Sequence, residues 1–273
     1  MTDTAGVTDR LAGIGRLGVA FSGGVDSSVL LALAVRALGA DRVVAVLGVS
    51  PSLAADERAA AHEVARHIGV AVVEVTTHEQ DVAAYRANGP DRCFHCKDEL
   101  FTRITDEVVT AHRLDAVAYG ENADDARRPD RPGARAAVTH RVLRPLADAG
   151  LDKAAVRAIA HTLALPCADK PAAPCLASRI PHFSEVNPEK LRQIELAEAA
   201  LRRLGFAELR VRHHGEVARI EVPEVDLDAV VAKREAVIEA VQAAGYRWVA
   251  LDLAGLQSGL FTLDALGLRG TGS

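Results

Sequence analysis

The chain has 273 residues, of which 49% are hydrophobic and 25% charged, and its formal net charge is −5 at pH 7. This composition is ordinary for a soluble globular protein, and the acidic balance argues against a protein that binds mainly nucleic acid, because such proteins usually carry a basic excess. No apolar run is long enough to cross a bilayer and the N-terminus has no signal-peptide pattern, so we expect a cytoplasmic protein with no membrane partner.

The first predicted element is a buried strand that leads into a glycine turn. Residues 17–28 read LGVAFSGGVDSS, and the apolar run at their start is typical of such a strand. Gly23 and Gly24 lack the Cβ atoms that would block a tight turn. After the turn stand three residues of the kind that cap a helix, namely Asp26, Ser27 and Ser28. Because a helix N-terminus presents unpaired amides and the positive end of the macrodipole, this turn predicts a phosphate site.

The string Ser-Gly-Gly-x-Asp-Ser over residues 22–27 resembles the pyrophosphatase loop, or PP-loop, of enzymes that split ATP between its α and β phosphates. It is not a Walker loop, because the Walker spacing and its lysine are missing. An ordinary glycine turn is the alternative, but the complete string after an apolar strand favours an ATP site in an enzyme that adenylates its substrate. The loop residues predicted to bind ATP are Ser22, Gly23, Gly24, Asp26, Ser27 and Ser28, and two of them, Asp26 and Ser27, are also predicted to be catalytic.

Strands and helices alternate after this loop. The predicted helices span residues 27–37, 54–67 and 97–112, and the predicted strands span residues 43–49, 71–75, 116–120 and, last in the sheet, 142–143. This rhythm predicts an α/β fold, in which a Rossmann-like parallel sheet is covered by helices on both faces and forms a first domain of residues 1–165.

Polar residues follow the predicted strands at the edge where parallel sheets bind ligands, beyond the carboxyl ends of the strands. The loop over residues 120–125, GENADD, has groups that can hydrogen-bond a ribose or hold Mg²⁺ at the phosphates, although a solvated turn is the alternative for its acidic residues taken singly. Arginines beyond it either meet phosphate or solvate the loop, namely Arg127, Arg128, Arg131 and Arg135. The further residues predicted to bind ATP are Gly48, Ser50, Gly120, Asn122 and Asp125.

The chain beyond residue 165 has a different pattern. Residues 166–187 are predicted to form a cysteine-bearing linker or active-site loop, since residues 166–181 contain four prolines and no helical period. Residues 188–273 are predicted to form a smaller α+β domain for substrate binding or oligomerisation, with a disordered tail after Leu268. Its predicted helices span residues 188–204 and 226–243, and its predicted strands span residues 209–213, 218–222 and 248–253.

Four cysteines in a chain of this kind are more typical of metal binding or catalysis than of disulfides. Cys93 and Cys96 form a Cys-x2-Cys pair just before a predicted helix, and Cys175 lies in the proline-stiffened loop. Three thiolates that leave one coordination site open fit an iron–sulfur cluster. A tetrahedral zinc site completed by Cys167 or His95 is one alternative, and idle thiols are another. Taken alone, Cys167 is expected to be a small core residue.

The motifs SGGVDSS, RCFHCK, GENADD, RPG and PAAPCLASRIP together resemble those of the LarE family of ATP-dependent sulfur transferases, over nearly the whole chain from Val19 to about Asp252. The resemblance implies a first domain like the adenine nucleotide α-hydrolases, a smaller second domain and a homo-oligomer. It also implies the reaction, in which ATP adenylates the carboxylates of pyridinium-3,5-biscarboxylic acid mononucleotide and sulfur converts them to thiocarboxylates. This reaction belongs to the synthesis of the nickel-pincer nucleotide cofactor of lactate racemase.

The resemblance implies two sources of sulfur. In one version of the family, the cysteine that matches Cys175 gives up its own sulfur and becomes dehydroalanine. In the other version, the cysteines that match Cys93, Cys96 and Cys175 hold a [4Fe–4S] cluster, and a sulfide on its open iron is transferred. All three cysteines are present, which favours the cluster version. The sacrificial version stays open, because Cys175 is common to both.

Charged residues in and after the cysteine loop are candidates for binding substrate phosphate or a metal, although surface ion pairs are an equal alternative for each. They are Arg179, which we place among the catalytic residues with Cys175, and Arg210, Arg212, Glu195, Glu198 and Glu221.

Other classes of protein share part of this pattern. A tRNA thiolase would have the ATP loop and the cluster, but it would need a basic RNA surface, which the acidic balance disfavours. An amide-forming ligase would have the loop and would need no cysteines. A nucleotide sensor without enzyme activity would leave the cysteines unexplained.

Overall fold

A computed structural model describes residues 4–127, 132–171 and 173–256 of the chain. The described residues form two compact units, the first containing those up to Glu79 and Cys93–Ala173, the second containing Gln80–Arg92 and those from Pro174 onward. The division therefore falls inside the predicted linker, and residues 80–92 join the second unit. Among the described residues, no helix combines the length and the apolar character that crossing a bilayer requires. Arg128, Arg131 and the predicted tail after Leu268 lie outside them.

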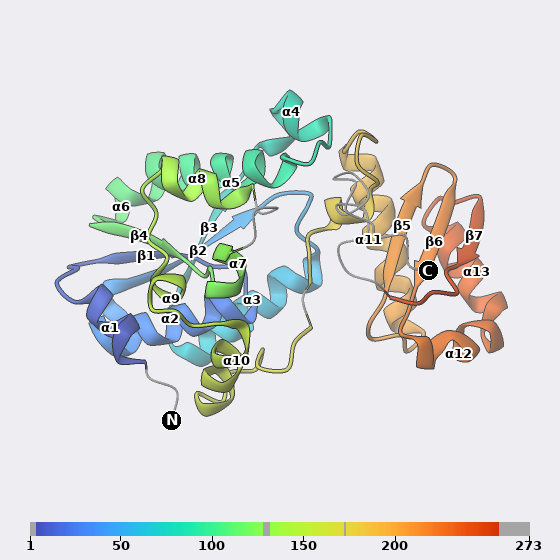
Figure 1. Cartoon of the computed structure of the whole chain (residues 1–273). Coiled ribbons are helices and arrows are strands. Elements are labelled where there is room, and N and C mark those ends of the chain that lie inside the picture. The colour runs from blue at the N-terminus through green and yellow to red at the C-terminus, as the bar shows by residue number, and fades with distance from the viewer. Residues whose placement is uncertain (1–3, 128–131, 172, 257–273) are drawn as a thin grey trace. The chain divides into compact units, whose positions relative to one another are not determined.

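A four-stranded parallel sheet is the centre of the first unit (Figure 1). The strands lie in the order β3-β2-β1-β4, with Leu17 of β1 opposite Val43 of β2 and Ala116 of β4. Helices cover both faces of the sheet, so its central strands are short aliphatic runs. The predicted α/β fold with a parallel sheet is confirmed. The strands are β1 (Leu17–Ala20), β2 (Val43–Val49), β3 (Val72–Thr76) and β4 (Ala116–Tyr119).

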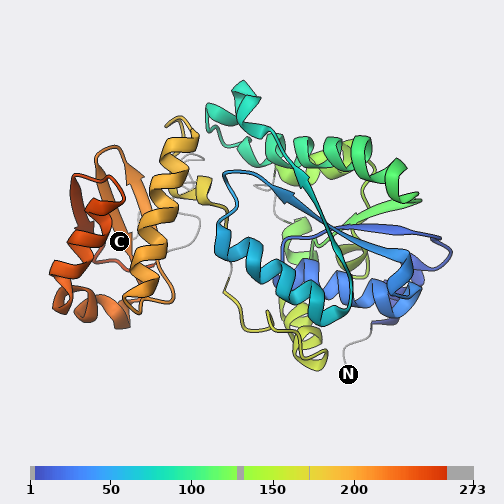
Figure 2. The ribbon, with the colours of Figure 1, turned by 180° about the vertical axis from the view of Figure 1, so that it is seen from behind.

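Helices lie on both faces of this sheet, as Figures 1 and 2 show. One face carries α1 (Ala5–Leu11), α2 (Val25–Leu38), α3 (Ala55–Ile68), α9 (Pro145–Asp148) and α10 (Lys153–Thr162). The other face carries α5 (Arg92–Arg103), α6 (Thr110–His112) and α8 (Gly133–Thr139). Each face has its own apolar core, with Leu30 and Ile159 in one and Phe101 and Ile104 in the other.

The helix predicted over residues 97–112 begins earlier than the sequence indicated. It starts at Arg92 as α5 and continues through a π-helical segment, Ile104–Val109, into α6. The prediction that Cys93 and Cys96 lie before this helix is therefore wrong, because both lie within its first five residues. Residues three apart share one face of a helix, so the two thiols are neighbours on α5.

The last predicted strand, over residues 142–143, is also absent from the four-stranded sheet. Leu143 forms only an isolated bridge to Ala118. Pro145 follows two residues later at the first position of α9, and its fixed φ is suited to opening a helix rather than extending a strand.

The second unit contains a three-stranded sheet in the order β5-β6-β7, in which β5 and β6 are antiparallel and β6 and β7 parallel. The predicted smaller α+β fold is confirmed. Its long helix α11 starts at Pro188, and the Asn187 side chain caps it by accepting a hydrogen bond from the Lys190 amide at 2.9 Å. The helix predicted over 226–243 is divided at Lys233. The elements are α11 (Pro188–Arg203), β5 (Arg210–His214), β6 (Val217–Glu221), α12 (Leu227–Ala232), α13 (Arg234–Ala243) and β7 (Trp248–Leu251).

Candidate active site

The turn between β1 and α2 brings bare backbone to the start of a helix. Gly24 is the N-cap of α2, so the predicted capping residues Asp26, Ser27 and Ser28 lie in its first turn instead. Gly23 has a φ of +70°, and a Cβ on it would lie 2.7 Å from the Cα of Ala61 in α3. Only glycine therefore fits at this position without displacing α3.

The serine hydroxyls of this turn bind the turn itself. Ser27 Oγ donates to the Gly24 carbonyl at 3.1 Å and accepts from the Ser22 amide at 3.2 Å. Ser28 Oγ donates to the same carbonyl at 2.8 Å. The hydroxyls thus hold the loop in one shape, so the amides in the first turn of α2 can face a phosphate without a rearrangement of the backbone.

The end of β4 packs directly against the PP-loop. A Cβ on Gly120 would lie 2.5 Å from the Ser27 nitrogen and 2.7 Å from the carbonyl carbon of Asp26. The strand order reverses between β1 and β4, and ligands of open α/β sheets bind at such a switch point. The loops after these two strands meet at that point.

Asp26 is the centre of a polar network that joins three loops of the first unit. Its Oδ2 lies 2.6 Å from Lys153 Nζ, and its Oδ1 accepts from Asn122 Nδ2 at 3.2 Å. The same amide donates to Asp125 Oδ2 at 3.1 Å. The predicted residues Asp26, Asn122 and Asp125 are thus brought together. Lys153 was missed by the sequence analysis, although it directly follows the cap residue Asp152 of α10.

Gly48 and Ser50, at the end of β2, have contacts that explain them without a ligand. A Cβ on Gly48 would lie 2.7 Å from Leu100 Cδ1, so glycine lets α5 pack against the strand. Ser50 Oγ donates to Glu79 Oε1 at 2.5 Å, and Glu79 is buried. The assignment of Gly48 and Ser50 to ATP stays a prediction.

None of the four cysteines, all of which lie in the described ranges, forms a disulfide, and their environments differ. Cys93 is exposed and Cys96 half-buried on α5 of the first unit, whereas Cys175 is exposed in the second unit. Cys167 is 2% exposed in the apolar core, as predicted for a core residue. Within the described ranges, no three or more His, Cys, Asp or Glu side chains are grouped to hold a metal. The cluster and the zinc site both stay predictions.

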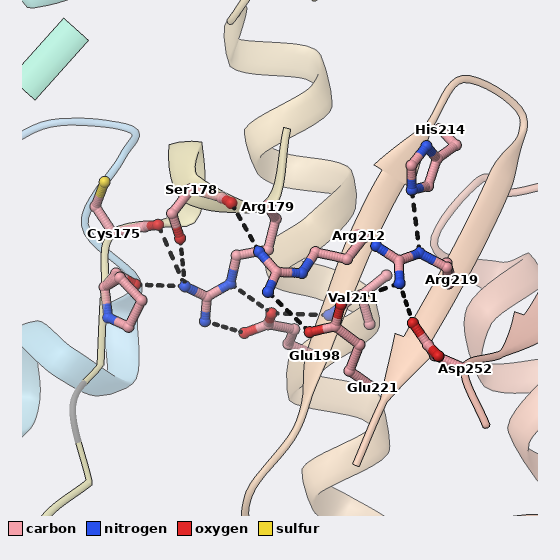
Figure 3. Close-up of polar contacts among 11 residues, drawn as sticks. Cys175, Ser178, Arg179, Glu198, Val211, Arg212, His214, Arg219, Glu221 and Asp252 are labelled. Carbon is pink, nitrogen blue, oxygen red and sulfur yellow. Dashed lines mark hydrogen bonds and ion pairs between the residues drawn. The ribbon is translucent and has the colours of Figure 1, made fainter. Parts of the chain in front are cut away.

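Arg179 closes the loop that carries Cys175 (Figure 3). Its guanidinium donates to the carbonyls of Pro174 and Cys175, and it forms a two-point ion pair with Glu198 of α11 at 2.8 and 3.1 Å. Arg179 is 5% exposed and Glu198 1% exposed. The sulfur of Cys175 points away from this guanidinium. Arg179 therefore fixes the backbone around Cys175 and leaves its thiol open.

A second buried ion pair joins the same loop to the hairpin of β5 and β6. Arg212 donates to Glu221 Oε2 at 2.8 Å and to the Ser178 carbonyl at 2.9 Å. Arg219 also pairs with Glu221, at 3.2 Å, and with Asp252 (Figure 3). Ion pairs, which were the alternative to ligand binding for Glu198, Arg212 and Glu221, are therefore present, but they are buried rather than on the surface.

Arg210 and Glu195 complete the set of charged candidates. Arg210 is buried in β5, and its pKa is lowered by burial and by the charges of Arg212 and Arg179. Three buried guanidinium groups, those of Arg179, Arg210 and Arg212, thus gather around the two buried carboxylates of Glu198 and Glu221, which leaves a positive excess. Glu195 is half-buried on α11.

Comparisons with known proteins agree with this geometry. Residues 4–117, which contain the PP-loop and the strands β1 to β4 up to Val117, match the asparagine synthase family. The chain is 32% identical over 258 residues to the pyridinium-3,5-bisthiocarboxylic acid mononucleotide synthase of Lactiplantibacillus plantarum, which covers 94% of this chain and 93% of that protein. The chain belongs to the LarE family.

Two uncharacterized proteins are also similar to this LarE-family chain. One, from Synechocystis sp., is 40% identical over 243 residues, which are 88% of this chain and 90% of that protein. The other, from Methanocaldococcus jannaschii, is 32% identical over 166 residues, 61% of this chain and 64% of that protein. The predicted family is confirmed, and so is the class of enzyme, an ATP-dependent sulfur transferase that uses ATP through its PP-loop domain.

We expect Gly120→Ala to damage the ATP domain of this LarE-family enzyme. The added Cβ would overlap the PP-loop backbone, and overpacking of this kind costs about 1–3 kcal/mol of stability. Thermal unfolding and ATP binding measure the loss. Gly6→Ala in α1 is the matched control, because its Cβ would meet only side-chain atoms, those of Arg10 at 3.4 Å and Ala149 at 3.5 Å. Equal unfolding temperatures for both variants would contradict the close approach of β4 to the loop.

The two arginines that bind Glu198 should differ in their effect on the LarE-family second unit. Arg179→Ala leaves a buried carboxylate without its main partner and should lower the free energy of unfolding by about 3–5 kcal/mol. Arg202 binds the same carboxylate at 3.0 Å but is 33% exposed, so Arg202→Ala should cost about 1 kcal/mol or less. Urea titration followed by the single tryptophan, Trp248 in β7, measures both. Similar costs would contradict the burial of the Arg179 pair.

The second unit should also lose stability below neutral pH. Burial, and then the nearby Lys190, lower the pKa of His213, whose Nε2 lies 3.0 Å from Gln193 Oε1. A base with a lowered pKa leaves stability unchanged above its unfolded pKa of about 6.5 and costs stability as the pH falls below it. The urea concentration at half-unfolding should therefore decrease as the pH is lowered from about 7.5 to about 5.5. This decrease should be smaller in His213→Asn. The same dependence of the urea midpoint on pH in that variant would show that His213 is not the group responsible.

Proposed function

We propose that this LarE-family enzyme adenylates the carboxylates of pyridinium-3,5-biscarboxylic acid mononucleotide and converts them to thiocarboxylates. The printed name of the L. plantarum relative gives the bisthiocarboxylic product for that protein. In this chain, the PP-loop and the loop over residues 120–125 lie together at the switch point of the sheet, and this is the main support for the proposal.

The chemistry explains why a PP-loop is needed. A carboxylate is a poor acyl donor because its leaving group would be oxide. An oxygen of the carboxylate attacks the α phosphorus of ATP, the bond to the bridging oxygen breaks, and pyrophosphate leaves with that electron pair. AMP then becomes the leaving group when sulfur attacks the activated carbonyl. The backbone amides at the turn of Gly23 and Gly24 and the N-terminus of α2 would stabilise the negative charge of the phosphates.

Asp26 and Asp125 are the residues that would hold Mg²⁺. Their carboxylates fit that cation, because Mg²⁺ prefers oxygen ligands, and both accept from the single side-chain amide of Asn122. A bound Mg²⁺ would neutralise phosphate charge during the attack.

For the sulfur source, we propose a [4Fe–4S] cluster held by Cys93, Cys96 and Cys175. The support is the placement of Cys93 and Cys96 three residues apart on α5 and the exposed thiol of Cys175, whose backbone Arg179 fixes. Such a cluster would supply an open iron for a transferable sulfide. Under the competing proposal Cys175 gives up its own sulfur.

The buried arginines of the second unit suit the phosphate of the mononucleotide. We assign Arg210 and Arg212 to that phosphate, because burial and then the charges of Arg212 and Arg179 lower the pKa of Arg210, and a phosphate dianion would relieve the repulsion between the guanidinium groups. Glu195, Glu198 and Glu221 stay candidates for metal or substrate contacts. A homo-oligomer also belongs to the proposal, and light scattering tests it.

The nucleotide product tests the proposed reaction. With Mg²⁺ and the dicarboxylate mononucleotide, the enzyme should split ATP into AMP and pyrophosphate, and without the acceptor the release of pyrophosphate should stop. ADP as the stoichiometric product would contradict cleavage between the α and β phosphates.

A further inference from the structure

Arg92 is a buried residue that joins two distant segments of the second unit. It is 7% exposed, and its Nη1 donates to the Ala177 carbonyl at 2.9 Å and to Asn88 Oδ1 at 2.6 Å. The residue that follows Arg92 is Cys93, and the Cα atoms of neighbouring residues are about 3.8 Å apart. The place of the Ala177 carbonyl therefore limits where the chain can enter the Cys93–Cys96 pair.

Ala177 belongs to the same tight turn as Cys175. Cys175 directly precedes the 3₁₀-helical turn η4 (Leu176–Arg179), and its carbonyl accepts from the Ser178 amide at 2.9 Å. Ala177 is fully buried within this turn, whereas Cys175 is exposed. A shift of the Ala177 carbonyl would therefore move the backbone that carries the exposed thiol.

Two arginines tie this turn to two different elements. Arg179 ties it to α11 through the ion pair with Glu198. Arg92 ties it to the segment of residues 80–92, which runs directly into α5. The first tie fixes the turn within the second unit, and the second relates the turn to the chain that carries the other two cysteines.

Asn88 gives Arg92 a rigid base. Its side chain is fully buried, and while Oδ1 accepts from Arg92, Nδ2 donates to the carbonyls of Pro181 and Ser184 at 2.8 and 2.9 Å. Its φ of +56° lies in the left-handed region, which asparagine adopts more readily than most residues. A buried amide with partners on both its oxygen and its nitrogen is costly to rearrange. Asn88 therefore holds the Arg92 guanidinium in one place.

We propose that Arg92 is a positioning residue of sulfur transfer, which keeps the Cys175 thiol within reach of the thiols of Cys93 and Cys96. This inference rests on the proposed function, in which these three cysteines serve one cluster. The tie arranges the thiols before any group binds to them, so that no ordering of the chain is left to the moment of binding. Loss of the tie would leave all three thiols present but free to separate.

Chemical cross-linking measures the separation of the thiols without a bound cluster. In full-length protein purified without iron, Cys96→Ala and Cys167→Ala leave two of the four cysteines, Cys93 and Cys175. Dibromobimane becomes fluorescent when it has joined two nearby thiols, and we expect it to join these two. Adding Arg92→Met removes the tie and should slow the cross-link by about tenfold, which corresponds to about 1.4 kcal/mol.

Two further variants separate positioning from a general loss of order. Arg92→Lys keeps the charge on a shorter stem and can replace one of the two bonds, so it should fold and cross-link at a rate between those of the other two proteins. Arg86→Met is the matched control from the same segment, because the Arg86 guanidinium binds the Gln80 carbonyl at 2.8 Å and lies 3.8 Å from Glu185 Oε1. It should cross-link at the rate of the two-cysteine protein. Each rate is divided by the rate of labelling with monobromobimane, which reports the reactivity of a single thiol.

The cross-linking rates can contradict the inference directly. A rate in Arg92→Met within about threefold of that of the two-cysteine protein, a difference of about 0.7 kcal/mol, would overturn it. So would an unchanged rate in Arg92→Lys, or a two-cysteine protein that forms no cross-link.

Product analysis separates this inference from the proposed function. With all four cysteines present, Arg92→Met should release pyrophosphate at the wild-type rate and transfer sulfur about 10²-fold more slowly, as expected when reacting groups are misplaced. Wild-type sulfur transfer in this variant would also overturn the inference. A wild-type enzyme that forms no thiocarboxylate would instead overturn the proposed function, while the cross-linking rates would still support the arrangement of the thiols by Arg92.

Discussion

Cys175→Ala should abolish sulfur transfer while acyl-adenylate formation continues at the wild-type rate. Both proposed sulfur sources need the Cys175 thiol, which lies in the second unit. The PP-loop and the polar network around Asp26 lie in the first unit. Quantifying the thiocarboxylate product and the pyrophosphate from the same reaction measures the two steps separately. Cys167→Ala is the control, because this buried core thiol should be dispensable for both steps. Sulfur transfer by Cys175→Ala would contradict either mechanism.

Cys93→Ala then decides between the two sulfur sources. If a cluster is the source, this variant should lose the visible absorbance of the cluster and sulfur transfer together. If Cys175 is sacrificed, the variant should complete one turnover, and the used protein should be lighter by the mass of hydrogen sulfide. Intact mass spectrometry after a single turnover, on protein purified without oxygen, distinguishes the outcomes. Full repeated turnover by Cys93→Ala without a cluster would contradict the proposed ligand set.

Asp26→Ala should lower the rate of adenylation by about 10²–10³. Asp26 joins the PP-loop to Asn122 and Lys153, so its removal takes away the proposed Mg²⁺ ligand and the partner of the Lys153 ammonium. Pyrophosphate release measures the rate. Asp41→Ala is the control, because Asp41 is exposed before the amino end of β2, at the edge of the sheet opposite the loop. Comparable rates in the two variants would remove Asp26 from the site.

The part of the fold that local pattern determines was predictable. The strand β2 has the predicted bounds, and the glycine turn lies between a strand and a helix as its string of residues indicated. These features depend on apolar runs and glycine positions, that is, on residues close to one another in the sequence. They were enough to place the loop over residues 120–125 beside the PP-loop at one edge of the sheet.

Features that depend on distant residues were not predictable. Asn88, in the segment that joins the second unit, is buried and donates to the carbonyls of Pro181 and Ser184, more than 90 residues away. Arg92, the first residue of α5, donates to Asn88 Oδ1 at 2.6 Å and to the carbonyl of Ala177, which lies 85 positions further along the chain. For the same reason an ion pair of Glu198 could be expected from the sequence, whereas its burial could not.

The conversion of the acceptor itself tests the central claim most directly. The enzyme, purified without oxygen, is mixed with ATP, Mg²⁺ and pyridinium-3,5-biscarboxylic acid mononucleotide, and the small molecules are analysed by mass spectrometry. We predict an acceptor that is heavier by the difference between one sulfur and one oxygen for each converted carboxylate, and equal numbers of AMP and pyrophosphate molecules. An acceptor of unchanged mass, or one converted to an amide, would contradict the assignment of sulfur transfer to this substrate.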